Sequence, residues 1–132
     1  MASVFSKIVA GEIPCYKIAE DEKHLAFLDV FPLVKGHVLV IPKQEVDKYF
    51  DLDDNTIVSL NLFAKKVAIA LEKAIPCKRV GVAIIGLEVP HVHIHLVPLN
   101  AMRDIDFTQP KQKFAPEEMD AVAASIRQYL TS

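Results

Sequence analysis

Apolar residues fall along the chain in a pattern that predicts five short strands. The strands are expected at Tyr16 to Ala19, His24 to Leu28, His37 to Ile41, Arg79 to Gly86 and His91 to Pro98. The third segment is β-branched and apolar and stops at Pro42, as a buried strand should. The last two segments flank a turn from Gly86 to Pro90, and this order predicts an antiparallel hairpin.

Helical spacing of apolar positions marks three further segments. A short helix is expected from Ser3 to Val9, and a last helix from about Pro116 to about Leu130, with proline at its first position and acidic residues in its first turn. Between them, a long helix is capped by Asp53 or Asp54 and runs to about Lys73. Strands and helices are segregated rather than strictly alternating, which predicts an α+β fold with an antiparallel sheet.

The long helix carries two apolar rows where a surface helix of a monomer needs only one. The first row is Ile57, Leu60, Ala64, Val67 and Leu71, and the second is Val58, Leu62 and Ile69. The second row therefore packs either against a partner subunit or within the chain's own fold. The sequence leaves both possibilities open.

Composition narrows the class of protein. With 132 residues, 52% of them hydrophobic and 24% charged, the chain is expected to form a single globular domain over residues 1–132. A net charge of −2 gives no electrostatic reason to expect nucleic acid or a membrane surface as a partner. The distant cysteines Cys15 and Cys77 and the lack of an evident secretory signal predict a cytoplasmic protein with reduced thiols.

The segment that carries candidate chemistry is the last predicted strand. Because side chains alternate between the faces of a strand, His91, His93 and His95 are expected on one face, and the apolar residues between them on the other. Three of the chain's five histidines thus share one face, which packing alone rarely produces. Another histidine, His24, is expected at the surface.

Two kinds of chemistry use such a cluster. A zinc or iron ion can be held by two imidazoles at H-x-H spacing, with His37 or Glu88 as a further ligand, although three imidazoles along one strand converge poorly on one ion. Alternatively, a neutral imidazole attacks phosphorus when an acceptor holds its other nitrogen, and neighbouring imidazoles donate to the phosphoryl oxygens.

The segment from His91 to Val97 reads H-φ-H-φ-H-φ-φ, where φ is apolar, and resembles the signature of the histidine triad (HIT) family. Three other blocks resemble family motifs in the same order: Phe5 to Pro14 (F-x-K-I-x-x-G-E-I-P), Ala26 to Asp29 (A-F-x-D) and Gly36 to Lys43 (G-H-x-L-V-I-P-K). The motif-bearing core covers about 5–98, which leaves 99–132 as a C-terminal segment and helix. The Hint-like branch is the most similar, and the resemblance implies a HIT-like domain and a homodimer whose sheets join across the interface.

The resemblance also implies roles for individual residues. His93 is the expected nucleophile, which takes the nucleotidyl group as a covalent phosphohistidine that water then releases. His95 is expected to hydrogen-bond the phosphate, while His91 and His37 complete the cluster and hold His93 in the correct tautomer. Asp29 is expected to accept hydrogen bonds from the ribose hydroxyls. The residues expected to line the base pocket are Phe5, Ile8, Phe27, Leu28 and Val30.

The chain departs from the family pattern just before the triad. Where relatives have G-Q-S/T-V-x-H, this chain has Leu87 in place of the glutamine and Glu88 in place of the hydroxyl residue. An asparagine expected upstream is missing from the apolar run Val82 to Ile85. Those groups normally bind phosphate oxygens or help to protonate the leaving group. Glu88 is therefore a candidate proton donor to a departing amine or alkoxide, with a solvated turn residue as the alternative.

A second departure concerns metal. Many bacterial relatives begin C-x-x-C and carry a structural zinc there, whereas this chain has Ser3 or Val4 and Ser6 at those places. No metal and no other cofactor is therefore expected. The predicted function is hydrolysis at the α-phosphorus of a nucleoside phosphoramidate, such as an AMP-amine, or of a related purine nucleotide conjugate. A dinucleoside polyphosphate hydrolase, a catalytically weak nucleotide-binding protein and a metal-dependent enzyme are the alternatives.

Overall fold

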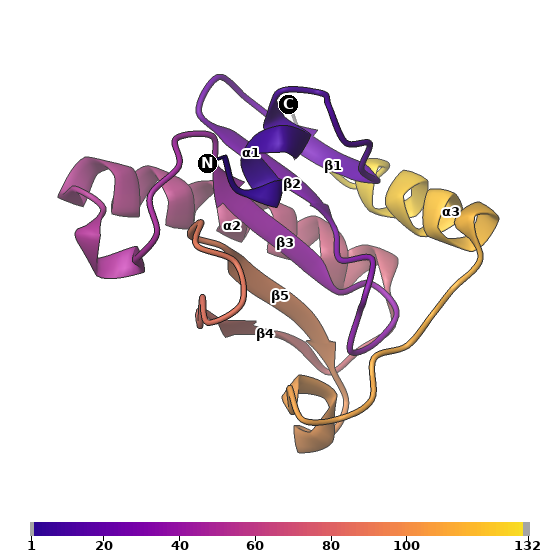
Figure 1. Cartoon of the computed structure of the whole chain (residues 1–132). Helices are drawn as coiled ribbons and strands as arrows, with labels where there is room; N and C mark the ends of the chain where they lie inside the picture. Colours follow the sequence, from indigo (N-terminus) through magenta and orange to yellow (C-terminus); the bar gives the residue numbers. More distant parts are fainter. Residues whose placement is uncertain (1, 131–132) are drawn as a thin grey trace.

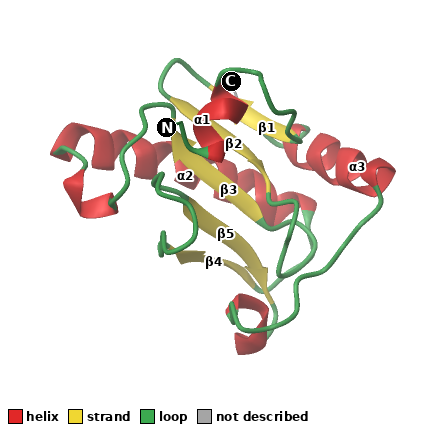
Figure 2. Cartoon of the chain, viewed as in Figure 1, coloured by secondary structure: helices red, strands yellow, loops and turns green. Residues whose placement is uncertain are grey.

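The computed structural model describes residues 2–130, and its elements follow the predicted order (Figures 1 and 2). The strands are β1 (Lys17–Glu20), β2 (His24–Leu28), β3 (Val38–Pro42), β4 (Arg79–Ala83) and β5 (Ile94–Leu99). The helices are α1 (Val4–Val9), α2 (Asp54–Ala74) and α3 (Pro116–Arg127), with short 3-10 helices η1 (Tyr49–Asp51) and η2 (Met102–Ile105). The predicted α+β class, with a long helix and a C-terminal helix, is confirmed.

The sheet is antiparallel throughout, with strand order β1-β2-β3-β5-β4. The predicted hairpin is present, since β4 pairs directly with β5 and Ala83 lies opposite His95. On its other side β5 pairs with β3, where Leu39 lies opposite His95. His95 is therefore held in the interior of the sheet, while β1 and β4 form the two edges.

The two faces of the sheet are covered differently, as Figure 2 shows: α2 and α3 lie behind the sheet and α1 lies in front. Residues that alternate toward the helices, such as Leu28, Val40 and Ile94, form the main core with α2 and α3. On the opposite face Phe27 and Leu39 pack with Phe5 of α1. The short helix α1 therefore covers the face of the sheet on which the triad histidines are expected.

Only the first apolar row of α2 is buried. Leu60, Val67 and Leu71 of this row have no exposed surface. The second row lies on the outside of the chain, with Val58 58%, Leu62 61% and Ile69 49% exposed. Packing of this row within the chain's own fold is therefore wrong, and its packing against a partner subunit stays a prediction.

The first two histidines of the triad lie outside the sheet ladder, because β5 begins at Ile94 rather than at His91 as predicted. The main-chain N–H of His91 donates to the carbonyl of Val89 at 2.8 Å, and that of Val92 donates to Val46 at 2.8 Å. These bonds replace strand pairing and turn the chain before the ladder starts. No helix within residues 2–130 is both long and apolar enough to cross a bilayer.

Candidate active site

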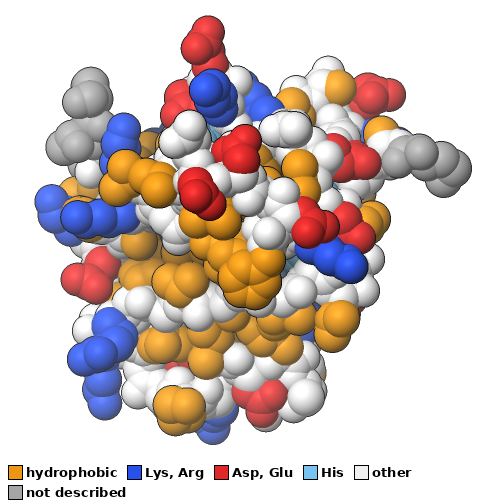
Figure 3. Space-filling model, turned by 90° about the vertical axis from the view of Figure 1, so that its left-hand side faces the viewer, with side chains coloured by type: hydrophobic (Ala, Val, Ile, Leu, Met, Phe, Trp, Pro, Cys, Tyr) orange, Lys and Arg blue, Asp and Glu red, His pale blue; other side chains and the backbone are white. Residues whose placement is uncertain are grey.

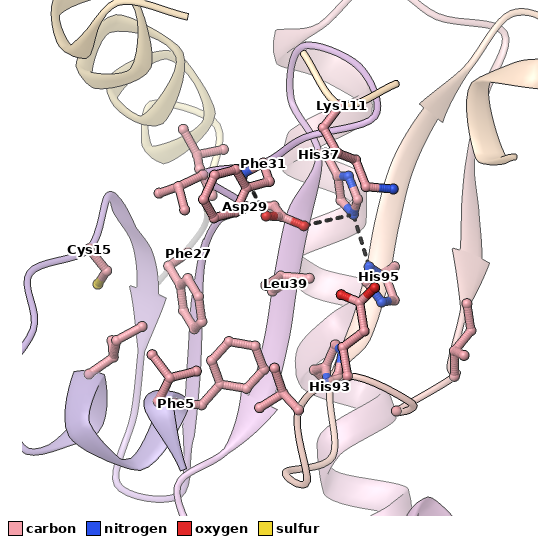
Figure 4. A pocket seen from close by; sticks show the side chains of 18 of the residues that line it. Phe5, Cys15, Phe27, Asp29, Phe31, His37, Leu39, His93, His95 and Lys111 are labelled. Atoms are coloured by element: carbon pink, nitrogen blue, oxygen red, sulfur yellow. Dashed lines mark hydrogen bonds and ion pairs between the residues drawn. The ribbon is translucent and has the colours of Figure 1, made fainter. Parts of the chain in front are cut away.

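A cavity of about 480 Å³ opens on the face of the sheet that α1 covers (Figure 4). Its walls come from α1, the end of β2 and the loop after it, the triad segment, the turn before the triad, and the segment around Phe107. All of the residues predicted to bind nucleotide line it: Phe5, Ile8, Phe27, Leu28, Asp29 and Val30. The cavity is therefore mostly apolar, with a polar wall on one side.

That polar wall contains three of the predicted histidines, His37, His93 and His95. Figure 4 shows them on the same side of the cavity, opposite Phe5 and Phe27. Glu88 also lines the cavity and is exposed to solvent. The remaining predicted site histidine, His91, does not line the cavity and has no exposed surface.

The hydrogen bonds of His93 define which of its nitrogens is free. Its Nδ1 lies 2.7 Å from the main-chain carbonyl of His91, so Nδ1 carries the proton and donates it. Nε2 then keeps its lone pair. The ring of Phe5 packs edge-on against the imidazole, with 5.0 Å between the ring centroids, and helps to fix its orientation.

His37 and His95 form a chain of hydrogen bonds whose direction is set at one end. The main-chain N–H of Leu33 donates to Nδ1 of His37 at 3.0 Å, so that nitrogen has no proton. The proton of a neutral His37 is therefore on Nε2, which donates to Nδ1 of His95 at 2.9 Å. His95 must then carry its own proton on Nε2. His37 thus orients His95 rather than His93, for which it was predicted.

His91 acts through its backbone and is itself fixed by two bonds. Its Nε2–H donates to the carbonyl of Pro42 at 2.8 Å, and its Nδ1 accepts from the hydroxyl of Ser3 at 2.8 Å. Because His91's carbonyl holds His93, the predicted tautomer control is made by the main chain of His91, not by its ring. No pattern in the sequence predicts the contact with Ser3, which joins positions 88 apart.

A small polar cluster joins the start of α1 to the triad segment. Ser3 caps α1 by accepting from the N–H of Ser6 at 3.0 Å. One carboxylate oxygen of Glu45 accepts from the N–H of Ser3 at 2.7 Å and from the hydroxyl of Ser6 at 2.6 Å. These bonds hold the pKa of Glu45 down to about 2, so it is ionised at neutral pH. Since a helix of six residues is unstable alone, this cluster keeps α1 in place.

The imidazoles of the site are neutral at pH 7. Burial lowers the pKa of His37 from 6.5 to about 3 and the pKa of His95 from 6.5 to about 4. Burial also lowers the pKa of His93 and of His91, against the opposing effect of their bonds to carbonyl oxygens. Neutral rings agree with the hydrogen-bond directions, because each proton has one defined position.

Asp29 lies at the boundary between the apolar and polar walls. Its Oδ1 accepts from the N–H of Phe31 at 2.9 Å, and its Oδ2 lies 3.7 Å from Nε2 of His37. Burial raises the pKa of Asp29, while the bond from Phe31 and the positive charge of Lys111 act in the opposite direction. The carboxylate thus offers acceptor oxygens next to the imidazoles, as a ribose-binding group requires.

Sequence reasoning missed Phe107 and Lys111, which line the cavity from a segment that reads as polar and irregular. Phe107 packs edge-on against His95, with ring centroids 4.7 Å apart. The prediction for His24 was wrong. That residue is buried, it bonds to Asp21 and to Ser59, and its ring stacks on Phe63 at 5.0 Å.

Comparison with known proteins agrees with this arrangement. Residues 10–102 match the HIT domain family. The chain belongs to the histidine triad family. It is 38% identical to the adenosine 5'-monophosphoramidase hnt1 of Schizosaccharomyces pombe over 132 residues, which cover 96% of this chain and 96% of that one. This nearly full-length match confirms the resemblance to the Hint-like branch.

Solved structures of the family share the fold. A Hit-like protein of Bartonella henselae superposes with a TM-score of 0.85 at 28% identity, over 97% of this chain and 96% of that one. A zinc-bound histidine triad family protein of Mycobacterium smegmatis superposes with a TM-score of 0.83 at 28% identity, over 98% and 94% of the two chains. The second neighbour raises the question of a metal site in this chain.

The residues present do not fit a zinc ion. Ligand atoms of Asp29, His37 and His95 lie within 4.8 Å of one another. However, the lone pair of His37 is on Nδ1, where it accepts from Leu33, and its Nε2 carries a proton. At the start of the chain, Ser3 and Ser6 offer hydroxyls, which are not among the ligands that zinc prefers.

Proposed function

We propose that this protein is a HIT-type hydrolase that cleaves at the α-phosphorus of nucleoside phosphoramidates or related purine nucleotide conjugates. The observation that carries the proposal is the state of His93. Its Nδ1–H is fixed on the carbonyl of His91, so Nε2 keeps the lone pair that a nucleophile needs. The name of the fission-yeast relative, an adenosine 5'-monophosphoramidase, supports the substrate class.

The walls of the cavity match the parts of a nucleotide. The base enters the apolar side, between residues such as Phe5 and Phe27. Asp29 accepts from the ribose hydroxyls with its free lone pairs. The α-phosphate then reaches the polar wall, where Nε2–H of His95 donates to a non-bridging oxygen.

The reaction has two displacement steps. First, Nε2 of His93 attacks the α-phosphorus, the bond from phosphorus to the amine nitrogen breaks, and the amine leaves with a proton. Second, a water oxygen attacks the same phosphorus, the bond between phosphorus and Nε2 breaks, and the nucleoside monophosphate leaves. During the first step charge on the imidazole of His93 is shared with the His91 carbonyl through Nδ1–H.

Glu88 is our candidate for the proton transfers of both steps. It lines the same cavity as His93 and Asp29, and its negative charge acts to raise the pKa of both, which supports a role for it beside the reacting groups. Glu88 is a carboxylate in the free protein and takes up a proton when an anionic phosphate lies beside it. As an acid it then protonates the departing amine, and as a carboxylate it accepts a proton from the attacking water. We propose that no metal or other cofactor is required, because the imidazoles supply the donors that stabilise the phosphoryl oxygens.

We further propose that the protein works as a homodimer. The edge strand β4 exposes Val82 at 58%, and the outer row of α2 exposes Val58, Leu62 and Ile69. Figure 3 shows hydrophobic side chains gathered over one face of the molecule rather than scattered singly. A second copy, with its sheet joined at β4, would cover an edge strand and an apolar helix row together.

Turnover of an AMP-amine in the presence of excess EDTA tests the proposal. Wild-type protein is expected to release AMP at the same rate with and without EDTA, and His93→Ala is expected to release none while keeping its fold. Tight AMP binding without turnover by the wild type would instead select a nucleotide-binding protein. Loss of turnover in EDTA, restored by added zinc, would select a metal-dependent enzyme.

A further inference from the structure

The negative and positive charges of the residues that line the cavity do not cancel. Among the described residues, they are two carboxylates, Asp29 and Glu88, and one ammonium, Lys111. The imidazoles add no positive charge, because His37 and His95 are each fixed in a neutral tautomer. A phosphate that enters this cavity therefore meets two negative groups and a single full positive charge.

Lys111 is held in position by the segment that carries it. The N–H of the next residue, Gln112, donates to the carbonyl of Pro32 at 2.8 Å, which ties the segment to the loop after Asp29. The ammonium of Lys111 donates to the carbonyl of Phe107 at 3.1 Å and lies 5.4 Å from the centroid of the Phe107 ring. Figure 4 shows the Lys111 side chain beside the imidazole of His37 and above His95.

We infer that Lys111 is the phosphate-binding cation of this site, and that its ammonium donates to the same α-phosphate whose other oxygen accepts from Nε2–H of His95. An ammonium has three donors, so Lys111 can bind phosphate without giving up the carbonyl of Phe107. This inference rests on the proposed function, since it requires a nucleotide in the cavity.

The position of the charge supports this assignment. Burial is the main cause of the pKa shifts of Asp29, His37 and His95, and the positive charge of Lys111 acts on all three groups, against burial at Asp29 and with it at the two histidines. Its ammonium therefore lies within electrostatic reach of the groups proposed to bind ribose and phosphate. The segment that replaces the expected polar residues has nothing comparable: Leu87 is apolar and 90% exposed, and Glu88 repels phosphate. Lys111 thus supplies, from a different segment, the phosphate-binding donor that the turn before the triad lacks.

The test compares AMP with adenosine, which differ only in the phosphate. Affinities are measured by titration calorimetry for the wild type, Lys111→Met and Lys111→Arg. Lys113→Met is the matched control, because Lys113 is an exposed lysine of the same segment that does not line the cavity. All proteins are compared at one low ionic strength, since salt screens the interaction.

Wild-type protein is expected to bind AMP more tightly than adenosine. Lys111→Met is expected to lose about tenfold in AMP affinity, as for a lost charge-assisted hydrogen bond, with adenosine affinity within about twofold of the wild type. Lys111→Arg and Lys113→Met are expected to keep the preference for AMP.

Three results would overturn the inference. If Lys111→Met keeps the full preference for AMP, Lys111 does not bind the phosphate, and the proposed function still stands. If the affinities for AMP and adenosine fall by the same factor, Lys111 only supports the cavity wall. If the wild type binds neither ligand, the proposed function fails and the inference fails with it.

Discussion

The contact between Ser3 and His91 can be tested by removing a single oxygen. In Ser3→Ala the hydroxyl that donates to Nδ1 of His91 is lost, and so is the cap of α1. His91 has no exposed surface, so water cannot replace the missing donor. In Ser6→Ala the hydroxyl that is lost donates to Glu45, whose exposed carboxylate is free to bind water instead.

These differences set the expected magnitudes. Loss of a helix N-cap costs about 1 kcal/mol, and a buried acceptor left without a donor costs about 1–3 kcal/mol. Ser3→Ala is therefore expected to lower the free energy of unfolding by about 2–4 kcal/mol. Ser6→Ala is expected to lower it by less than about 1 kcal/mol. Because His91's carbonyl holds His93, Ser3→Ala is also expected to lower kcat more than it changes KM.

Urea denaturation at pH 7.5 measures the stability of both variants, and initial rates with an AMP-amine measure kcat and KM. Ser6 Oγ lies 3.5 Å from Nδ1 of His91, so the double variant Ser3→Ala/Ser6→Ala checks whether Ser6 takes over as donor. Equal, small losses of stability in the two single variants, with no further loss in the double variant, would refute the role given to Ser3.

Three further predictions follow from the exposed row, the histidines and Glu88. Leu62→Glu places a charge on the outer row of α2 and is expected to give a folded monomer by light scattering; an unchanged mass would exclude this row from the interface. The unfolded chain binds protons first below pH 6.5, because burial lowers the folded-state pKa of His37 to about 3 and of His95 to about 4. The free energy of unfolding should therefore fall as the pH drops from 6.5 to 4, by about 3 kcal/mol for His95 alone at about 1.4 kcal/mol per pH unit. A flat stability profile over this range would show that these rings are not kept neutral by the fold. Glu88→Gln is expected to lower kcat and to flatten one limb of its pH profile, and an unchanged profile would end the proton-donor role.

Local pattern was sufficient for much of the fold. Strand β2 has the predicted bounds, and the alternation about Ile94 correctly separates core residues from site residues. The two rows of α2 were also visible in the sequence, although only the structure shows that the outer row is exposed. The spacing of apolar residues and the positions of proline and glycine are local properties of the chain, so one sequence is enough to find them.

What could not be predicted depends on contacts between distant segments. The bond between Ser3 and His91 joins the start of α1 to the triad segment, and the wall made by Phe107 and Lys111 depends on the bond from Gln112 to Pro32. The spacing of apolar residues does not encode contacts between segments that are far apart along the chain. The same reason explains the wrong prediction for His24, which is buried only because α2 brings Phe63 and Ser59 over it.

The most direct test of the central claim is the mass of the enzyme during turnover. Wild-type protein, mixed with an AMP-amine and denatured within the first turnovers, is predicted to carry one adenylyl group, and fragmentation is predicted to place it on His93. His93→Ala, treated in the same way, should carry none. An adenylyl group on another residue, or rapid turnover with no covalent species in the wild type, would contradict the account.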